Sequence, residues 1–156
     1  NPDYQTTNTA KSLSIALEHI DAETTLWING DVVFDSDILS SIVDSQYSCM
    51  GVMECDTRYE EIKFSTASDG TIDRVSKGVH PSIGEAIGIN KIISQDYRLF
   101  LNSLARCNKE DYFEKGIEFA INDGLRIFPM PITSGFAIEI DFESDLDNAN
   151  KYLLSN

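Results

Sequence analysis

Two acidic side chains follow short apolar segments, where strands of an α/β sheet would end. Asp31 follows "TLWING" (25–30), and Asp141 follows "FAIEI" (136–140), whose alternation places Glu139 and Asp141 on one face. Ligands of such sheets bind at the carboxyl ends of the strands. Because Mg²⁺ in phosphate-transferring sites is bound by one or two carboxylates plus substrate phosphates, this pair is a candidate Mg²⁺ site. Acids at strand ends also serve as helix caps or loop residues, and the spacing leaves both interpretations open.

Three other charged residues have two interpretations each. Asp35 and Asp37 form a DxD string, which in some glycosyltransferases holds a metal with a nucleotide sugar. The string precedes "ILSSIV", so N-capping of a helix and interaction with its dipole are sufficient to explain it, and this interpretation is favoured. Lys77 follows a predicted strand and could meet a phosphate, whereas an exposed lysine after a hairpin is usually a solvated charge.

The segment 110–114 combines acidic and aromatic residues at the start of a predicted helix. Tyr112 and Phe113 could line a ligand pocket, where an aromatic face can hold a quaternary ammonium group. Glu110, Asp111 and Glu114 are interpreted as structural, because acids in the first turn complement the helix dipole.

Apolar periodicity and turn residues predict the elements that must position these side chains. The pattern predicts helices at 9–20, capped by Thr7 or Asn8, and at 35–45, 94–107, 110–124 and from 143 onward. It predicts strands at 24–29, 48–54, 84–92, 125–132 and 135–141, and a hairpin that pairs 61–66 with 71–75 around Asp69-Gly70. The order indicates a mixed α/β architecture in one domain, residues 1–156.

Composition narrows the function classes. With 12 basic and 26 acidic residues the net charge is −14, which would repel a polyphosphate and argues against a nucleic-acid partner. No apolar run approaches the roughly 18 residues that span a bilayer, and the polar N-terminal segment is not a signal peptide, so a cytoplasmic location without a membrane partner is expected. The three cysteines have no CxxC spacing and are interpreted as reduced, mostly structural thiols.

Several strings together resemble the nucleoside-triphosphate transferase family, in particular the sugar-phosphate nucleotidyltransferases and the phosphocholine-type cytidylyltransferases. They are "NPDYQTTNTAKSLSIAL", "LWINGDVVFD", "DGTIDRVSKG", "GEAIGI", "DYFEKGIEFAINDG" and "FAIEIDFESDLDNA", in the family's order and approximate spacing. The most specific are the Gly30-Asp31 pair and the "EID…DL" ending. The resemblance implies a Rossmann-like mixed β-sheet with flanking helices and Mg²⁺-dependent transfer of a nucleoside monophosphate from an NTP to a phosphorylated acceptor, with release of diphosphate.

The resemblance also implies roles for individual residues. Asp31 and Asp141 would be the catalytic Mg²⁺ ligands, and Lys77 would contact the acceptor phosphate. The remaining substrate-binding candidates are Asn8 and Thr9 near the base, Glu85 and Gly88 at the strand edge that faces the acceptor, and Gly30, Glu139 and Tyr112.

The chain departs from the family in one respect. The Gly-rich loop of the LAAGxGxR kind, which cradles the triphosphate, has no counterpart here, so the resemblance covers the C-terminal two-thirds of such a domain, N-terminally incomplete. CTP or UTP is the expected nucleotide, and a sugar phosphate or a phosphocholine-like compound is the acceptor; Ala86 in "GEAIGI" offers no aromatic face for choline. Oligomer formation stays open. Two alternatives remain: a non-catalytic fragment or paralogue that binds or regulates, and a GT-A-like glycosyltransferase that uses Asp35 and Asp37.

Overall fold

The computed structural model describes residues 1–21 and 23–155. The helices are α1 (Thr9–Glu18), α2 (Ser36–Asp44), α3 (Tyr97–Leu104), α4 (Phe113–Asn122) and α5 (Glu143–Ser155). The strands are β1 (Thr25–Ile28), β2 (Val32–Phe34), β3 (Cys49–Met53), β4 (Lys63–Thr66), β5 (Ile72–Ser76), β6 (Gly84–Ile92), β7 (Phe128–Pro131) and β8 (Ala137–Glu139). All five predicted helices are present, and the predicted strand 84–92 matches β6 at both ends.

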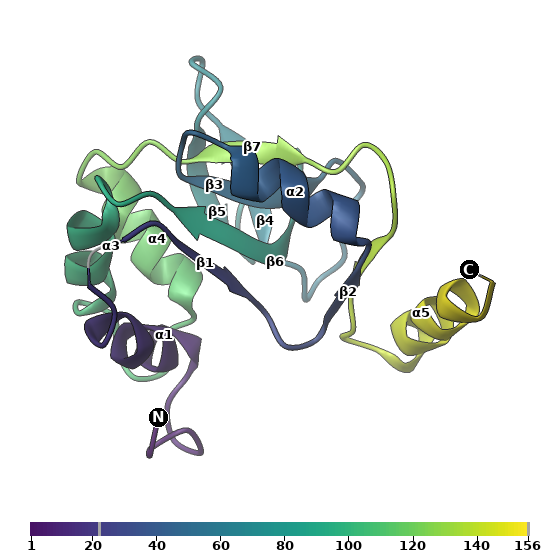
Figure 1. The fold of residues 1–156 in the computed structure, drawn as a ribbon, viewed down its shortest axis with the longest axis horizontal. Coiled ribbons are helices and arrows are strands. Elements are labelled where there is room, and N and C mark those ends of the chain that lie inside the picture. Colours follow the sequence, from purple (N-terminus) through teal and green to yellow (C-terminus); the bar gives the residue numbers. More distant parts are fainter. Residues whose placement is uncertain (22, 156) are drawn as a thin grey trace.

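A six-stranded mixed sheet forms the centre of the molecule (Figure 1). Its strands lie in the order β5-β4-β6-β3-β7, and β1 also pairs with β6. Only the β3–β7 pair is parallel among these pairings. The predicted hairpin is confirmed: β4 and β5 are antiparallel, and Gly70 takes the positive φ of 83° that the turn between them requires.

Helices cover both faces of this sheet. Successive side chains of a strand point to opposite sides, and both faces carry buried apolar side chains. Met50 and Ala86 belong to a hydrophobic cluster shared with α1, α3 and α4, whereas their neighbours Cys49 and Ile87 pack with Ile42 of α2. Figure 1 shows α2 over β3 and β6, with α1, α3 and α4 grouped together at one end. The mixed α/β sheet with flanking helices is therefore confirmed.

A second, two-stranded sheet was not predicted. β2 pairs antiparallel with β8, more than a hundred residues later, with Val32 opposite Glu139. Three residues after Asp31 are too few to give a recognisable alternation, and the strand exists only because β8 lies beside it. Asp31 consequently lies between β1 and β2, and Asp141 lies two residues beyond the end of β8.

The Asn8 cap predicted for the first helix is confirmed, whereas Asp35 does not cap α2 through its side chain. The Asn8 side chain accepts a hydrogen bond from the Thr9 N–H at 2.8 Å, and Gly124 follows α4 with φ 104°. Asp35 occupies the N-cap position of α2, but its side chain makes no capping bond. It accepts instead from the Phe136 N–H at 2.8 Å and the Tyr152 hydroxyl at 2.7 Å, and thereby links α2, β8 and α5.

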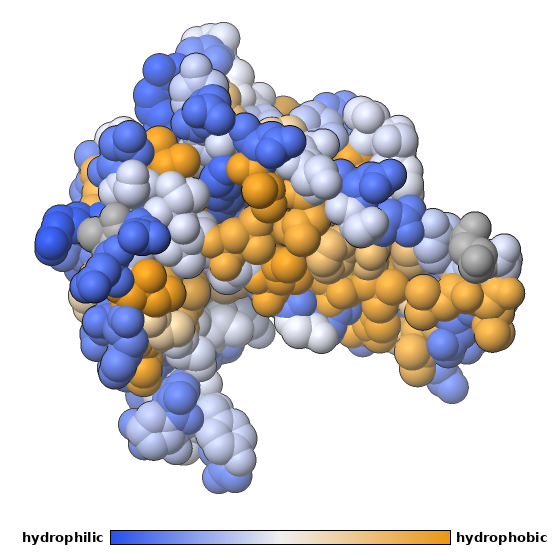
Figure 2. All heavy atoms as spheres, in the orientation of Figure 1, coloured by the Kyte–Doolittle hydropathy of each residue, from blue (hydrophilic) through white to orange (hydrophobic). Residues whose placement is uncertain are grey.

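The C-terminal helix projects from the body of the protein (Figure 1). It is attached at its far end by the Tyr152 ring, which stacks on Phe136 at a centroid distance of 4.1 Å. Figure 2 shows apolar surface that continues from the middle of the face onto this helix, where Leu146, Leu153 and Leu154 are exposed. Within residues 1–21 and 23–155 no helix combines the length and the apolar character needed to cross a membrane.

Candidate active site

A cavity of about 570 Å³, here called the central cavity, opens where β1 ends. Such a volume is in the range of small-molecule sites. Its walls come from segments far apart in sequence: α1, β1 and the loop after it, the loop before β4, the residue after β5, the start of α4, and the end of β8 with the residues that follow it. The lining side chains that can carry charge or hydrogen bonds are Thr9, Ser12, Trp27, Asn29, Asp31, Glu60, Lys77, Tyr112, Glu114, Glu139 and Asp141.

Backbone pairing brings the two strand-end aspartates to the same cavity. The Ile140 N–H donates to the Asp31 carbonyl at 3.0 Å, continuing the β2–β8 ladder to the residue beside Asp141. Asp31 and Asp141 both line the central cavity, although 110 residues separate them. Lys77 and Glu139 line it as well, so four of the predicted charged residues meet in one place.

The carboxylates in this cavity interact electrostatically. Partial loss of hydration raises the pKa of Asp141, and the negative charges of Asp145 and Asp31 raise it further. Burial likewise raises the pKa of Glu139, opposed by a hydrogen bond of 3.0 Å from the Asn29 amide, while Asp31 and Asp141 add to the rise. A cation between Asp31 and Asp141 would relieve this repulsion.

The donor set fits a hard divalent cation that is completed by a substrate. In the part of the chain that the structure describes, no three His, Cys, Asp or Glu side chains are arranged to hold a metal by themselves. Two carboxylates, with the remaining positions filled by phosphate and water oxygens, are the usual way in which proteins bind Mg²⁺. Asp31 and Asp141 are therefore the residues that could hold such an ion.

Lys77 is oriented by an acid and an aromatic ring. Its Nζ donates to Glu60 at 2.7 Å and lies 5.2 Å from the centroid of the Tyr112 ring. The hydrogen bond with Glu60 raises the pKa of Lys77, so the ammonium is charged at neutral pH. A phosphate that enters the cavity would meet a positive group already held beside the aspartates.

Glu114 is a cavity residue that sequence reasoning assigned a structural role. It lies in the first turn of α4 with 5% of its surface exposed, and its Oε2 has no hydrogen-bond partner among the described residues. Burial raises its pKa to about 7; the repulsion from Glu139 acts in the same direction, and hydrogen bonding to its own backbone opposes it. The sequence showed only an acid at a helix start, whereas its burial depends on the packing of α4 against β5 and α1.

Other predicted residues are divided between this cavity and elsewhere. Thr9, Gly30 and Tyr112 line the central cavity, whereas the Asn8 side chain is used as a helix cap. Glu85 lines a neighbouring cavity with Glu61, and burial raises its pKa to about 7. The DxD residues Asp35 and Asp37 are not among the residues that line the central cavity.

Gly88 does not line the central cavity but contacts Asn29, which does. It has φ 69°, its carbonyl accepts from the Asn29 N–H at 2.8 Å, and a Cβ added to it would lie 2.8 Å from the Asn29 side chain. Asn29 in turn donates to Glu139. The absence of a side chain at Gly88 therefore leaves room for the Asn29 side chain to reach Glu139.

Gly88→Ala is expected to lower the free energy of unfolding by more than backbone strain alone explains. A matched control is Gly70→Ala, because Gly70 also has a positive φ but nothing within 4 Å of an added Cβ. The left-handed conformation costs roughly 1–2 kcal/mol for a non-glycine residue in both variants. Urea denaturation should show an additional loss for Gly88→Ala, and equal losses would contradict the close approach of Asn29.

Comparison with known proteins finds similar solved structures, but no similar sequence family. No protein-family model matches the chain, and a search of curated proteins finds no match. Among solved structures, the inositol-1-phosphate CTP transferase from T. maritima superposes with a TM-score of 0.76 at 17% identity, covering 96% of this chain and 62% of that chain. The CTP:phosphocholine cytidylyltransferase LicC from Streptococcus pneumoniae gives a TM-score of 0.76 at 14% identity, covering 98% of this chain and 67% of that one. HddC from Yersinia pseudotuberculosis gives a TM-score of 0.67 at 16% identity, and the match covers 97% of this chain and 64% of that chain.

The chain therefore has the fold of nucleotidyltransferases, over nearly its whole length. This confirms, at the level of the fold, the resemblance that the motifs indicated. The chain spans about 62% of the length of the inositol-1-phosphate CTP transferase.

Proposed function

We propose that this chain carries the metal-binding and acceptor-binding part of a nucleotidyltransferase site. The observation that carries the proposal is the convergence of Asp31, Asp141 and Lys77 on one cavity, in a chain with the nucleotidyltransferase fold. The reaction is the transfer of a nucleoside monophosphate from an NTP, CTP or UTP, to a phosphorylated small molecule. Residues 1–156 would form the part of a single catalytic domain that follows the triphosphate-binding loop.

The proposed chemistry needs positioning and charge neutralisation more than a strong base. An oxygen of the acceptor phosphate attacks the α-phosphorus of the NTP, the bond from that phosphorus to the bridging oxygen breaks, and diphosphate leaves. Mg²⁺ held by Asp31 and Asp141 would supply positive charge to the phosphates. Lys77 would bind the acceptor phosphate, and its contacts with Glu60 and Tyr112 hold the ammonium in place before the acceptor arrives.

The GT-A-like alternative depends on Asp35 and Asp37, and the structure does not favour it. The Asp35 carboxylate already accepts hydrogen bonds from Phe136 and Tyr152. Asp37 is exposed in the first turn of α2, where the helix dipole accounts for it. Neither lines the central cavity.

Lys77→Met tests the assignment of the acceptor site. The experiment measures diphosphate release by the protein in the full length that its gene encodes, from CTP and from UTP with Mg²⁺. Inositol 1-phosphate, phosphocholine and a hexose 1-phosphate serve as acceptors. Since a hydrogen bond to a charged group contributes roughly 1.5–3 kcal/mol, the variant should raise the acceptor KM at least about tenfold and change the KM for the NTP much less.

Lys115→Met is the matched control. Lys115 also pairs with a glutamate, Glu118 at 3.0 Å, and lies 5.1 Å from an aromatic ring centroid, but it does not line the central cavity. It should leave both KM values unchanged. Absence of diphosphate release with every NTP and acceptor, together with no thermal stabilisation by Mg²⁺ and CTP or UTP, would favour a non-catalytic binding role instead.

A further inference from the structure

The turn that carries Asp141 is held by a buried carboxylate in the next element. Asp145, in the first turn of α5, is 4% exposed. Its Oδ2 accepts from the backbone N–H of Phe142 at 3.0 Å and of Asp141 at 3.3 Å. The direction in which the chain leaves β8, and with it the place of the Asp141 side chain, depends on these two bonds.

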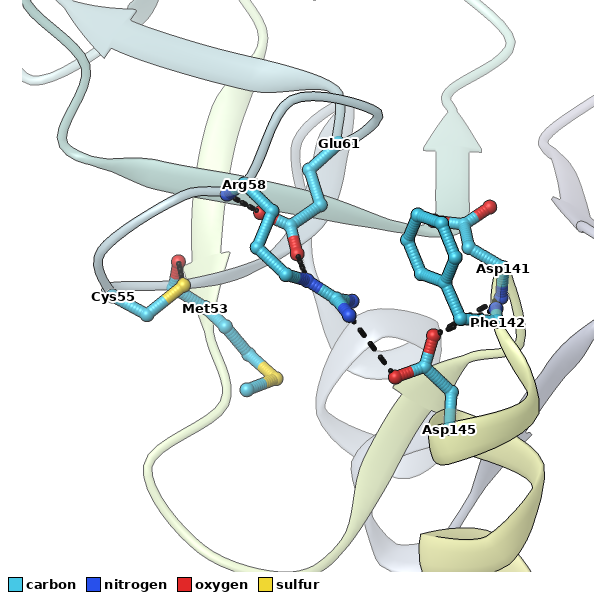
Figure 3. Close-up of polar contacts among 7 residues, drawn as sticks. All are labelled: Met53, Cys55, Arg58, Glu61, Asp141, Phe142 and Asp145. Carbon is cyan, nitrogen blue, oxygen red and sulfur yellow. Dashed lines mark hydrogen bonds and ion pairs between the residues drawn. The ribbon is translucent and has the colours of Figure 1, made fainter.

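The other oxygen of Asp145 is bound by an arginine from a distant loop. Arg58, between β3 and β4, donates from Nη1 to Asp145 Oδ1 at 3.2 Å. The same guanidinium donates from Nε to Glu61 Oε1 at 2.5 Å, the Arg58 backbone N–H also bonds to Glu61, and the Arg58 Cζ lies 5.1 Å from the centre of the Phe142 ring. Figure 3 shows the Asp145 carboxylate between this guanidinium and the two backbone amides.

These contacts require an arginine rather than a lysine. A guanidinium presents several N–H groups in a rigid plane, so it can bind two carboxylates and lie over a ring at once, which an ammonium cannot do. A buried carboxylate left without its cation is strongly disfavoured. Without Arg58, Asp145 would be driven toward solvent, and the amides of Asp141 and Phe142 would lose their acceptor.

We infer that Arg58, acting through Asp145, is a positioning residue that sets the Asp141 carboxylate opposite Asp31 for cation binding. Arg58 does not line the central cavity; it lines the neighbouring cavity together with Glu85 and Asp141, and its proposed effect on a cation beside Asp31 is transmitted through Asp145. This inference rests on the proposed function, because it gives Asp141 a cation to bind. Residues that orient a metal ligand from outside typically change metal affinity 10- to 100-fold when replaced.

The test compares Arg58→Met and Arg58→Lys with Arg106→Met in the full-length protein. Arg106 is a matched control because it also pairs with an aspartate, Asp123 at 2.6 Å, lies 4.8 Å from the centre of the Phe119 ring and has the same side-chain exposure of 48%. Two quantities are measured: the exchange rates of the Asp141 and Phe142 amide protons, and the dissociation constant for Mn²⁺, used as a paramagnetic probe with CTP present to complete its coordination.

Arg58→Met should accelerate exchange of both amides at least about tenfold and weaken Mn²⁺ binding by about tenfold. Arg58→Lys should recover part of each loss, and Arg106→Met should change neither. Unchanged exchange in Arg58→Met would overturn the inference regardless of any metal, and so would faster exchange with unaltered Mn²⁺ affinity. If the parent protein binds no Mn²⁺ that Asp31→Asn removes, the proposed metal site fails, and the inference fails with it.

Discussion

Asp31→Asn and Asp141→Asn are each expected to lower turnover by at least about a hundredfold while the protein stays folded. A bound metal supplies several kcal/mol of stabilisation to the charge that develops during phosphate transfer, and each 1.36 kcal/mol corresponds to a factor of ten in rate. Asparagine keeps the size of the side chain but removes the negative charge that binds the ion. Both residues are exposed at the ends of short strands, so neither substitution disturbs the core.

Diphosphate release measures this effect, and circular dichroism together with thermal unfolding verifies the fold. Asp37→Asn is the control, because it makes the same change of charge at an exposed aspartate that does not line the central cavity. It should retain the parent activity. A fully active double variant of Asp31 and Asp141 would end the magnesium hypothesis, and an inactive Asp37→Asn would return the DxD string to consideration.

Glu114→Gln is expected to change how stability depends on pH. Burial raises the pKa of Glu114 to about 7 in the folded protein, from an ordinary value of 4.5. Between these two pH values the folded state keeps the Glu114 proton, whereas the unfolded state has released it. The contribution of protonated Glu114 to the free energy of unfolding is therefore fully present below pH 4.5 and is lost as pH rises through about 7. At 1.36 kcal/mol per pKa unit the loss is on the order of 3 kcal/mol.

Glutamine has no proton to lose. Between pH 5 and pH 8 the free energy of unfolding of the variant should therefore rise relative to that of the parent protein. Urea denaturation at several pH values gives the free energies of unfolding. Glu85, whose pKa burial also raises to about 7, acts in the same direction, so some pH dependence should remain. Glu110→Gln replaces a largely exposed acid just before the same helix and should follow the parent curve. A parallel curve for Glu114→Gln would show that Glu114 ionises normally.

Local signals in the sequence determined most of the elements. Apolar periodicity located α1 through α5 and the strand 84–92, and the Asp69-Gly70 turn located the hairpin, because such patterns depend on residues a few positions apart. The motifs around Asp31, Lys77 and Asp141 indicated the nucleotidyltransferase fold, which the structural comparisons confirm. Their roles as metal and phosphate ligands remain predictions.

Tertiary structure alone decided which of the acids meet. Periodicity could not distinguish Asp35, which binds Phe136 and Tyr152, from Asp141, which enters the central cavity. The β2–β8 pairing, which brings Asp31 to Asp141, joins segments more than a hundred residues apart and leaves no local pattern. The burial of Glu114 and the contact of Arg58 with Asp145 likewise arise from long-range packing. Local propensity specifies where a strand or helix forms, but the free energy of a charged side chain depends on everything that surrounds it in the folded chain.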